Sequence, residues 1–384
     1  MHITVPQNEL EQATTVVSNL STRASGPHPV MGKLLIEAGE HGVQLRGTDF
    51  ESMVQVNVQG KIDRTGRLIV AADTFRDLIK LLPEKSDVVF EEVSGKAHIF
   101  TEDNEYNLTT ESAEDYPEWN VEEPLTSFQM SQKVFKSMLD ATTYALPLKD
   151  HRRVLLGVHF DLFDNKLQMT ATDGKKLARV TSPVPEIEGK QKMSLTVPRK
   201  LVENLSRSLG SEGPIEIELT ERQITARYSN ILYRGNALDG KYPDCDAVIP
   251  KEFPTRIVLN REHFLQSARR AGVVTDEKSR SIILTFSDNK CQFKSMAHAV
   301  GNFHGELKLD YTGEELEIAF NFQFLAETLG SFNDSNVILH VKTRNSPVVF
   351  KSREDDDRLA LLMPIKLSEA RADATAAAGA GTED

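Results

Sequence analysis

The sequence is poor in the residues and segments on which secreted and membrane proteins depend. Among its 384 residues there are two cysteines, Cys245 and Cys291, and one tryptophan. Two cysteines far apart in sequence imply no disulfide framework and fit a reducing compartment. No apolar run approaches the roughly 18 residues needed to cross a bilayer, and the residues after Met1 lack the basic and apolar regions of a signal peptide. These absences predict a cytoplasmic protein with no membrane partner.

Positive charge is outnumbered by negative charge. There are 45 Lys and Arg residues against 57 Asp and Glu, which gives a net charge of −12. Taken alone, this balance argues against a protein that coats nucleic acid or an anionic membrane. The positions of the positive charges therefore matter more than their total.

The familiar catalytic and metal-binding motifs are missing. We find no G-x-x-x-x-G-K, H-E-x-x-H, G-x-S-x-G or paired C-x-x-C, and the ten His residues are scattered without ligand spacing. The acidic run Glu354–Asp357 lies between two predicted strands, which favours a solvated hairpin tip over a cation site. Cys245 has no evident His partner for nucleophilic catalysis. We therefore expect no catalytic residue, no metal site and no cofactor.

What the sequence does contain is one pattern of roughly 120 residues, present three times in succession. Each copy opens with a short strand that leads into an amphipathic helix, and a second strand, a second helix and another β-type segment follow in the same order. The predicted opening strands are Ile3–Val5, Phe128–Met130 and Ile257–Leu259, and the second strands are Val43–Leu45, Leu167–Met169 and Cys291–Phe293. The second helices are predicted to start near Val70 and Val197 and to span 323–332, and the later strands are Val88–Phe90, Ile215–Ile217 and Val337–Leu339.

Two further signals mark the ends of these elements. Ser131 and Asn260 are well placed to cap the helices that open the second and third copies. The last strand of each copy is predicted to end in a proline, at Pro117, Pro243 and Pro364. The order and spacing of all these elements indicate a duplicated unit.

Two amphipathic helices and many short strands in each copy predict an α+β fold, with both helices on one face of the sheet. Short joins that contain Pro124 and Pro254 divide the chain into domains at 1–125, 126–254 and 255–367. Residues 368–384 consist mainly of Ala, Gly, Thr and acids, which predicts a disordered tail.

The basic residues gather on the predicted helices in spite of the acidic total. Lys80 and Arg207 occupy equivalent positions on the second helices of the first two copies. For one helix alone, a solvated polar face explains such charges. Their recurrence favours a shared surface that faces a polyanion. The pattern is incomplete, because the first helix of copy one and the second helix of copy three carry no base.

Four segments carry a more specific likeness: Ala171–Ala178, Thr196–Lys200, Asp239–Asp244 and Met363–Leu367. Together with the repeat, they resemble the bacterial DNA polymerase III β-subunit family, the sliding clamps, from Met1 to Leu367. The resemblance implies three repeated clamp domains, each with two helices packed on antiparallel sheets. It also implies a head-to-tail homodimeric ring around double-stranded DNA, with no catalysis of its own. The implied partners are the replicative polymerase catalytic subunit, the clamp loader, and repair and translesion polymerases that dock through short linear motifs.

Helix dimensions support a ring of two chains. Six helices of about 10 Å width make a ring of roughly 19 Å diameter and leave about 9 Å clear, which is too narrow for a duplex on the order of 20 Å across. Twelve helices give roughly 38 Å between axes and about 28 Å clear. One chain cannot encircle DNA, whereas two can.

The resemblance also assigns residues to three sites. The DNA-facing candidates are Arg23, Lys149, Arg152, Arg199 and Lys200, to which the helix pattern adds Lys80 and Arg207. The implied partner-peptide pocket comprises Leu155, Thr172, Gly174, Lys175, Leu177, Pro243, Val248, Leu361, Met363, Pro364, Ile365 and Lys366. The implied ring interface brings Tyr106 and Leu108 of one chain against Val273 and Val274 of the other, so that different patches meet. The position of the tail beside the pocket motivates the hypothesis that it transiently covers this groove.

Three alternatives remain open from the residues themselves. The run Leu359–Met363 would be a simple core strand if there were no pocket. The turn Thr172–Gly174 and the acids near Asp355 could belong to an enzyme, although polymerase or nuclease chemistry would need clustered carboxylates and two metals. A diverged repeat protein could bind protein motifs without encircling DNA.

Overall fold

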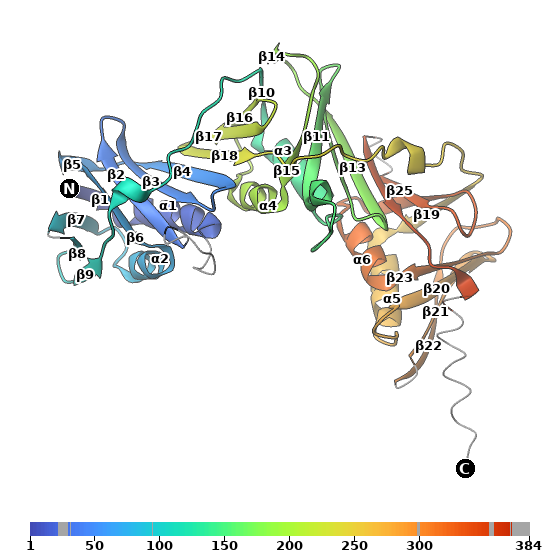
Figure 1. The fold of residues 1–384 in the computed structure, drawn as a ribbon. Coiled ribbons are helices and arrows are strands. Elements are labelled where there is room, and N and C mark those ends of the chain that lie inside the picture. Colours follow the sequence, from blue (N-terminus) through green and yellow to red (C-terminus); the bar gives the residue numbers. More distant parts are fainter. Residues whose placement is uncertain are drawn as a thin grey trace. The chain divides into compact units, whose positions relative to one another are not determined.

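The computed structural model describes residues 1–21, 30, 32–93, 95–297, 300–352, 357–368 and 370 (Figure 1). The chain divides into two compact units, and the middle repeat contributes to both. Unit 1 comprises Met1–Ser137, Phe160–Lys166 and Pro183–Asp239, and unit 2 comprises Met138–His159, Leu167–Ser182 and Gly240–Asp384. The predicted domain boundaries at 125 and 254 therefore stay predictions. No helix among the described residues is long and apolar enough to span a membrane.

The described residues form six α-helices, two in each repeat as predicted. They are α1 (Gln7–Leu20), α2 (Ala72–Leu81), α3 (Gln132–Thr143), α4 (Arg199–Ser208), α5 (Arg261–Gly272) and α6 (Phe322–Gly330). Short 3-10 helices lie at η1 (Ala113–Asp115), η2 (Arg153–Leu156) and η3 (Asp246–Val248). The predicted cap at Asn260 is confirmed, because its side chain accepts the His263 N–H at 3.0 Å and so satisfies a free donor in the first turn of α5.

Unit 1 contains two antiparallel sheets. The first has the order β5 (Lys61–Arg64), β1 (His2–Pro6), β7 (Asp87–Val93), β8 (Lys96–Phe100), β9 (Glu105–Thr109). The second has the order β14 (Ile187–Gly189), β10 (Thr126–Ser131), β16 (Pro214–Leu219), β17 (Gln223–Tyr228), β18 (Ile231–Asn236), β4 (Ser52–Val58), β3 (Gly42–Thr48), β2 (Lys33–Gly39), β6 (Gly66–Ala71). Pairing of β18 with β4, for example Tyr233 opposite Val54, joins the first two repeats in one sheet. Helix α1 packs on β3 and β4 and contacts both α2 and α4.

Unit 2 is organised in the same way. One sheet contains β12 (Lys166–Thr172), β13 (Lys176–Pro183), β26 (Arg358–Leu362), β25 (Val348–Ser352), β24 (Asn336–Val341) and β19 (Thr255–Asn260) in that order. The other has the order β22 (Gly301–Lys308), β21 (Lys290–Ala297), β20 (Ser281–Ser287), β23 (Leu316–Asn321). The strands β11 (Gly157–Phe163) and β15 (Met193–Pro198) complete the middle repeat. Helices α5 and α6 pack against each other and on these sheets, over a core that includes Phe264, Phe286 and Phe293.

The predicted proline endings of the last strands are wrong in two copies. Strand β9 ends at Thr109 and β18 ends at Asn236, well before Pro117 and Pro243. Proline has no N–H to give to a ladder, so it sits here in the connecting segment. The aromatic residue before each proline, Tyr116 or Tyr242, is buried, which explains the apolar signal that resembled the end of a strand. Only Pro364 lies close after its strand, β26.

Candidate functional site: a pocket at the turn before β13, and the basic helices

The turn between β12 and β13 is held by its own side chains. The Thr172 hydroxyl donates to the Lys176 carbonyl at 2.8 Å and accepts the Gly174 N–H at 3.1 Å. One carboxylate oxygen of Asp173 accepts the N–H groups of both Lys175 and Lys176 at 2.8 Å. Gly174 has φ +84°, a conformation that favours glycine. Asp173 is thus occupied in shaping the turn.

The first repeat contains the same turn at its equivalent position. The Thr48 hydroxyl donates to the Ser52 carbonyl at 2.8 Å and accepts the Phe50 N–H at 3.0 Å. Asp49 accepts the Ser52 N–H at 2.7 Å. The recurrence of this network, including a positive φ of 69° at Phe50, supports duplication at the level of individual hydrogen bonds. It also shows that the Thr–Asp pair is a structural device of the repeat.

Beside the second of these turns lies a pocket of about 240 Å³ in unit 2. Its floor consists of buried apolar side chains, Leu155, Leu177 and Leu361, which belong to one small core cluster. Met363 and Val248 stand at the rim and are 40% and 49% exposed. An apolar floor with a flexible methionine wall suits the docking of short apolar side chains.

Nine of the twelve residues predicted for the pocket line it: Leu155, Thr172, Gly174, Lys175, Leu177, Pro243, Val248, Leu361 and Met363. The structure does not bring Pro364, Ile365 or Lys366 into this lining. Ile365 instead donates its N–H to the Ala319 carbonyl on β23 at 2.8 Å. Four lining residues were not predicted: Arg152, Lys176, Asp244 and Cys245. Leu361 belongs both to strand β26 and to the pocket lining, so the core-strand alternative is compatible with the pocket.

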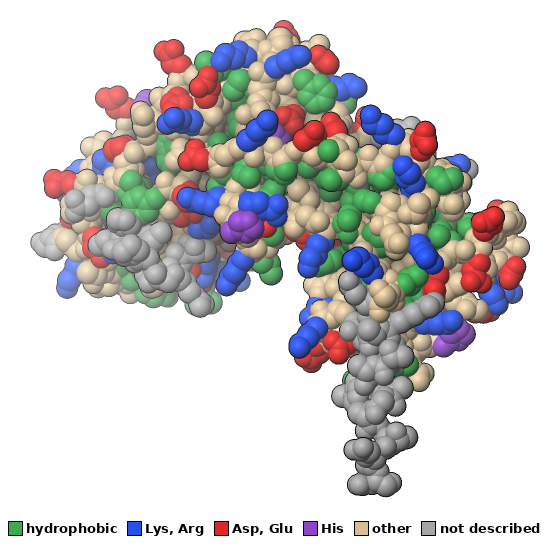
Figure 2. All heavy atoms as spheres, turned by 45° about the vertical axis from the view of Figure 1, so that its right-hand side comes forward, with side chains coloured by type: hydrophobic (Ala, Val, Ile, Leu, Met, Phe, Trp, Pro, Cys, Tyr) green, Lys and Arg blue, Asp and Glu red, His purple; other side chains and the backbone are tan. Residues whose placement is uncertain are grey.

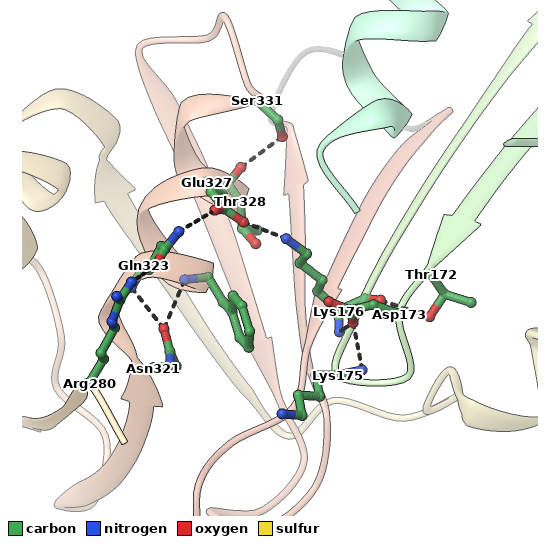
Figure 3. Close-up of polar contacts among 11 residues, drawn as sticks. Thr172, Asp173, Lys175, Lys176, Arg280, Asn321, Gln323, Glu327, Thr328 and Ser331 are labelled. Carbon is green, nitrogen blue, oxygen red and sulfur yellow. Dashed lines mark hydrogen bonds and ion pairs between the residues drawn. The ribbon is translucent and has the colours of Figure 1, made fainter. Parts of the chain in front are cut away.

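Lys176 is the most unusual of these four, because it is a buried lysine (Figure 3). Its ammonium group forms an ion pair with Glu327 on α6. It also lies over the rings of Phe324 and Tyr144, at 4.9 and 5.7 Å from the ring centres, where cation–π attraction compensates part of the lost hydration. Glu327 in turn accepts a hydrogen bond from Gln323 at 3.1 Å. The charge of Lys176 therefore ties the pocket turn to α6.

Arg152 was predicted to face DNA, and the structure places it in the pocket lining. Its guanidinium donates to Asp150 at 3.1 and 3.0 Å. These bonds lower the pKa of the Asp150 carboxyl to about 2. The ion pair with Asp150 keeps the Arg152 guanidinium beside Gly174. A Cβ atom added to this glycine would lie 3.8 Å from the guanidinium.

Comparisons with known proteins decide the family. Sequence models of the N-terminal, central and C-terminal domains of the DNA polymerase III beta subunit match residues 1–121, 129–244 and 246–366. The chain belongs to the DNA polymerase III beta subunit family. The β sliding clamp of Synechococcus elongatus is 27% identical over 374 residues, which cover 96% of this chain and 100% of that one. The Escherichia coli K12 β sliding clamp is 27% identical over 343 residues, 88% of this chain and 93% of that one.

Solved structures agree on the fold. A sliding clamp from Bartonella birtlesii, bound to griselimycin, superposes with a TM-score of 0.90 at 26% identity, over 95% of this chain and 99% of that one. The Pseudomonas aeruginosa beta subunit gives 0.90 at 24%, over 95% and 100%. The resemblance inferred from sequence is confirmed, and with it the three clamp domains and the antiparallel sheets. The function of the family, a non-catalytic DNA sliding clamp for the replicative polymerase, is the function of this chain.

The enzyme alternative is contradicted by the family, which is non-catalytic, and Asp173, one of its candidate residues, has a structural role. Asp173 is held in the turn, and no group of three or more potential metal ligands occurs among the described residues. Asp355 lies outside the described residues.

The basic residues of α4 are partly engaged within unit 1. Arg199 pairs with Glu203 at 2.8 Å, and Arg207 lies 3.9 Å from the same carboxylate. Lys200 donates to the Leu20 carbonyl at 2.8 Å, near the C-terminal end of α1. Of these three cations, Arg207 is the most exposed.

The other DNA candidates occupy different settings. Lys80 is exposed in the last turn of α2 and has no ion-pair partner among the described residues, whereas Arg76 on the same helix pairs with Asp73 and Asp77. Lys149 is exposed in unit 2, and Arg23 lies outside the described residues. Figure 2 shows Lys and Arg interspersed with Asp and Glu over one face, so the charge there is mixed.

The predicted interface residues lie on or near open sheet edges. Tyr106 and Leu108 belong to β9, the edge strand of its sheet in unit 1. Val273 follows the end of α5, is 77% exposed and precedes Val274. Helix α5 packs on β22, the edge strand of a sheet in unit 2. Unpaired edge strands are ready to pair with another chain.

Proposed function

We propose that two copies of this chain close head to tail into a ring around duplex DNA. The observation that carries this proposal is the pair of open edges, β9 in unit 1 and β22 in unit 2, in a chain of three clamp domains. Addition of β9 of one chain to β22 of the next would satisfy both rows of unpaired backbone groups. Exposed Val273 beside one edge, and Tyr106 and Leu108 on the other, would supply the apolar contact.

The mass in solution and behaviour on DNA test this proposal together. We expect light scattering to give about twice the 42.9 kDa of one chain. Clamps loaded onto a nicked circle should stay bound in high salt and should slide off after the circle is cut once. Retention on the linear DNA would contradict encirclement, because only a closed circle holds a topologically linked ring. A monomer that binds motif peptides would instead support the diverged repeat protein.

We infer that Lys80, Lys149, Arg199, Lys200, Arg207 and Arg23 contact the DNA phosphates from the ring lining. A ring held by topology needs few such contacts, since each adds salt-dependent affinity and drag. This explains how a chain with a net negative charge can still encircle DNA. Neutralising Arg207 alone should lower the dependence of DNA affinity on salt by about one ion, whereas neutralising Lys61, which pairs with Asp63 on β5, should leave it unchanged.

We further propose that the pocket beside Thr172–Lys176 receives short linear motifs of partner proteins. The supports are its apolar floor, its exposed Met363 and Val248, and the griselimycin-bound relatives. The expected partners are the replicative polymerase catalytic subunit, the clamp loader, and repair and translesion polymerases. Since bacterial DNA lies in the cytoplasm, we place the protein there.

A matched pair of exposed apolar residues tests the pocket. Met363→Ala should weaken the binding of a motif peptide by roughly tenfold, because one apolar wall is removed from the docking surface. Leu148→Ala changes an exposed side chain outside the pocket lining and serves as the control. Fluorescence anisotropy with a labelled peptide measures both. Equal affinities would remove the pocket from the proposal.

A further inference from the structure

A second groove lies in unit 2, on the sheet of β20, β21 and β22. Its cavity is about 290 Å³, and the apolar side chains that it presents on this face are Ile283 and Met296. Ile283 alternates with the core residues Ile282 and Leu284, so it points to the face of the sheet opposite the core. The groove shares no lining residue with the partner-peptide pocket.

The polar atoms of this groove are incompletely satisfied. Ser281 is only 9% exposed, and its hydroxyl has no hydrogen-bond partner among the described residues. The buried hydroxyl of Ser279, also in the lining, has none either. Buried hydroxyl groups are normally hydrogen-bonded, so this pair points to an occupant with backbone or side-chain polar groups. At the rim, Lys294 and His304 are exposed and have no ion-pair partner in the described part of the chain.

The chain itself runs into this groove after the last matched family residue, Lys366. Ile365 pairs with Ala319 on β23, and Ala319 lies opposite Ile283 on β20. Ala370 then donates its N–H to the Lys366 carbonyl at 3.0 Å, a helical turn. Ala370 is 5% exposed and is one of the groove's lining residues. The polypeptide therefore crosses from the edge of the sheet onto its outer face.

We propose that this groove is the docking site of the segment Arg371–Ala378 of the same chain. The segment reads Arg-Ala-Asp-Ala-Thr-Ala-Ala-Ala, and its small side chains suit a shallow apolar groove. Asp373 supplies the charge complementary to Lys294 and His304, and the backbone supplies partners for Ser281. The cost of docking is small, because Ala370 already fixes one end of the segment.

This placement differs from the hypothesis drawn from the sequence, that the tail covers the partner-peptide pocket. The last described residue lies in the other groove. The tail would then shield the apolar face of Ile283 and Met296 and leave the partner pocket open. Every contact that the inference uses lies within unit 2, and exchange at β20, which is an inner strand of its sheet, separates tail docking from ring closure at β22.

Hydrogen–deuterium exchange of the full chain, compared with the chain ended after Leu367, tests the proposal. We expect amides of β20 and β22 to exchange several-fold faster in the shortened chain. A synthetic peptide of residues 368–384, added in trans, should restore protection. In the full chain, Asp373→Lys should increase exchange at the same strands, whereas Asp384→Lys should leave it unchanged.

Two outcomes would overturn the proposal. One is unchanged exchange at β20 and β22 in the shortened chain, with no effect of the added peptide. The other is a change confined to the turn Thr172–Lys176, which would place the tail in the partner pocket instead.

Discussion

At the scale of single residues, the buried Lys176 offers the clearest energetic test. Replacing Lys176 with Met removes the ion pair to Glu327 and leaves that carboxylate without its partner. Loss of one member of a fully buried pair costs about 3–5 kcal/mol. The Glu327 side chain is 32% exposed and regains water, so we expect a loss of about 1–2 kcal/mol. Denaturant unfolding of the variant measures this loss.

The neighbouring lysine provides the control. Lys175 is exposed, so Lys175→Met should change the free energy of unfolding by less than about 0.5 kcal/mol. In a double-mutant cycle with Glu327→Gln, the effects of the two changes should be non-additive. Strict additivity would show that the pair contributes nothing to stability.

Asp150 supplies a prediction in pH. Its pKa is lowered from 3.8 to about 2, mainly by the hydrogen bond from Arg152. A lowered carboxyl pKa means that the interaction is fully present above the ordinary value and is lost only as the pH falls through about 2. A carboxyl titration by NMR should therefore show Asp150 ionised at pH 3. In Arg152→Gln its midpoint should return toward 3.8. A midpoint that does not move would assign the shift to another cause.

At the scale of elements, Lys200 and Arg207, both proposed to face DNA, differ in how far each is engaged within unit 1. The Lys200 Nζ donates a hydrogen bond to the Leu20 carbonyl and forms an ion pair with the Asp49 carboxylate, each at 2.8 Å. Lys200 therefore links α4 to the end of α1. Lys200→Met should lower the free energy of unfolding by about 1 kcal/mol, the typical net value of such a hydrogen bond. Arg207→Met should leave it within about 0.5 kcal/mol. Equal effects in thermal unfolding would contradict this division.

The elements also show what sequence reasoning could and could not reach. The six helices follow from local periodicity and were predicted. Pairing of Leu177 with Leu361 joins distant parts of the chain, and no local pattern encodes the partner of a strand. The ion pair of Lys176 was missed for the same reason, since Glu327 is far away in sequence. Arg152 was assigned to DNA through the family resemblance, and the structure adds it to the pocket lining; no local pattern connects it with the turn at Gly174.

Pro364, Ile365 and Lys366, which follow Met363 in sequence, were assigned to the pocket because the family motif continues through them. The structure separates the motif where Ile365 turns to pair with β23. A contiguous motif in sequence is thus divided between a binding surface and a sheet edge. The Pro117 and Pro243 predictions failed in a related way, because a buried tyrosine beside a proline produces the same apolar signal as the end of a strand.

At the scale of the whole molecule, head-to-tail closure requires two different patches on each chain, whereas a self-complementary dimer uses the same patch on both chains. Each interface would use the β9 patch of one chain and the patch at Val273 of the other. Leu108→Asp damages the first patch and Val273→Asp the second, each by placing a charge in an apolar contact. We expect either variant alone to be monomeric at micromolar concentration in analytical ultracentrifugation.

The mixture of the two variants is decisive. The intact Val273 patch of the Leu108→Asp chain can meet the intact β9 patch of the Val273→Asp chain, so one sound interface forms and the second cannot. The mixture should therefore contain an open dimer, although each variant alone is a monomer. A Val93→Asp chain, altered at an exposed residue of β7 away from the edge strand, should dimerise unaided. If the mixture stays monomeric, or if only one of the two variants loses its dimer, the two patches do not meet each other and the ring cannot close in this way.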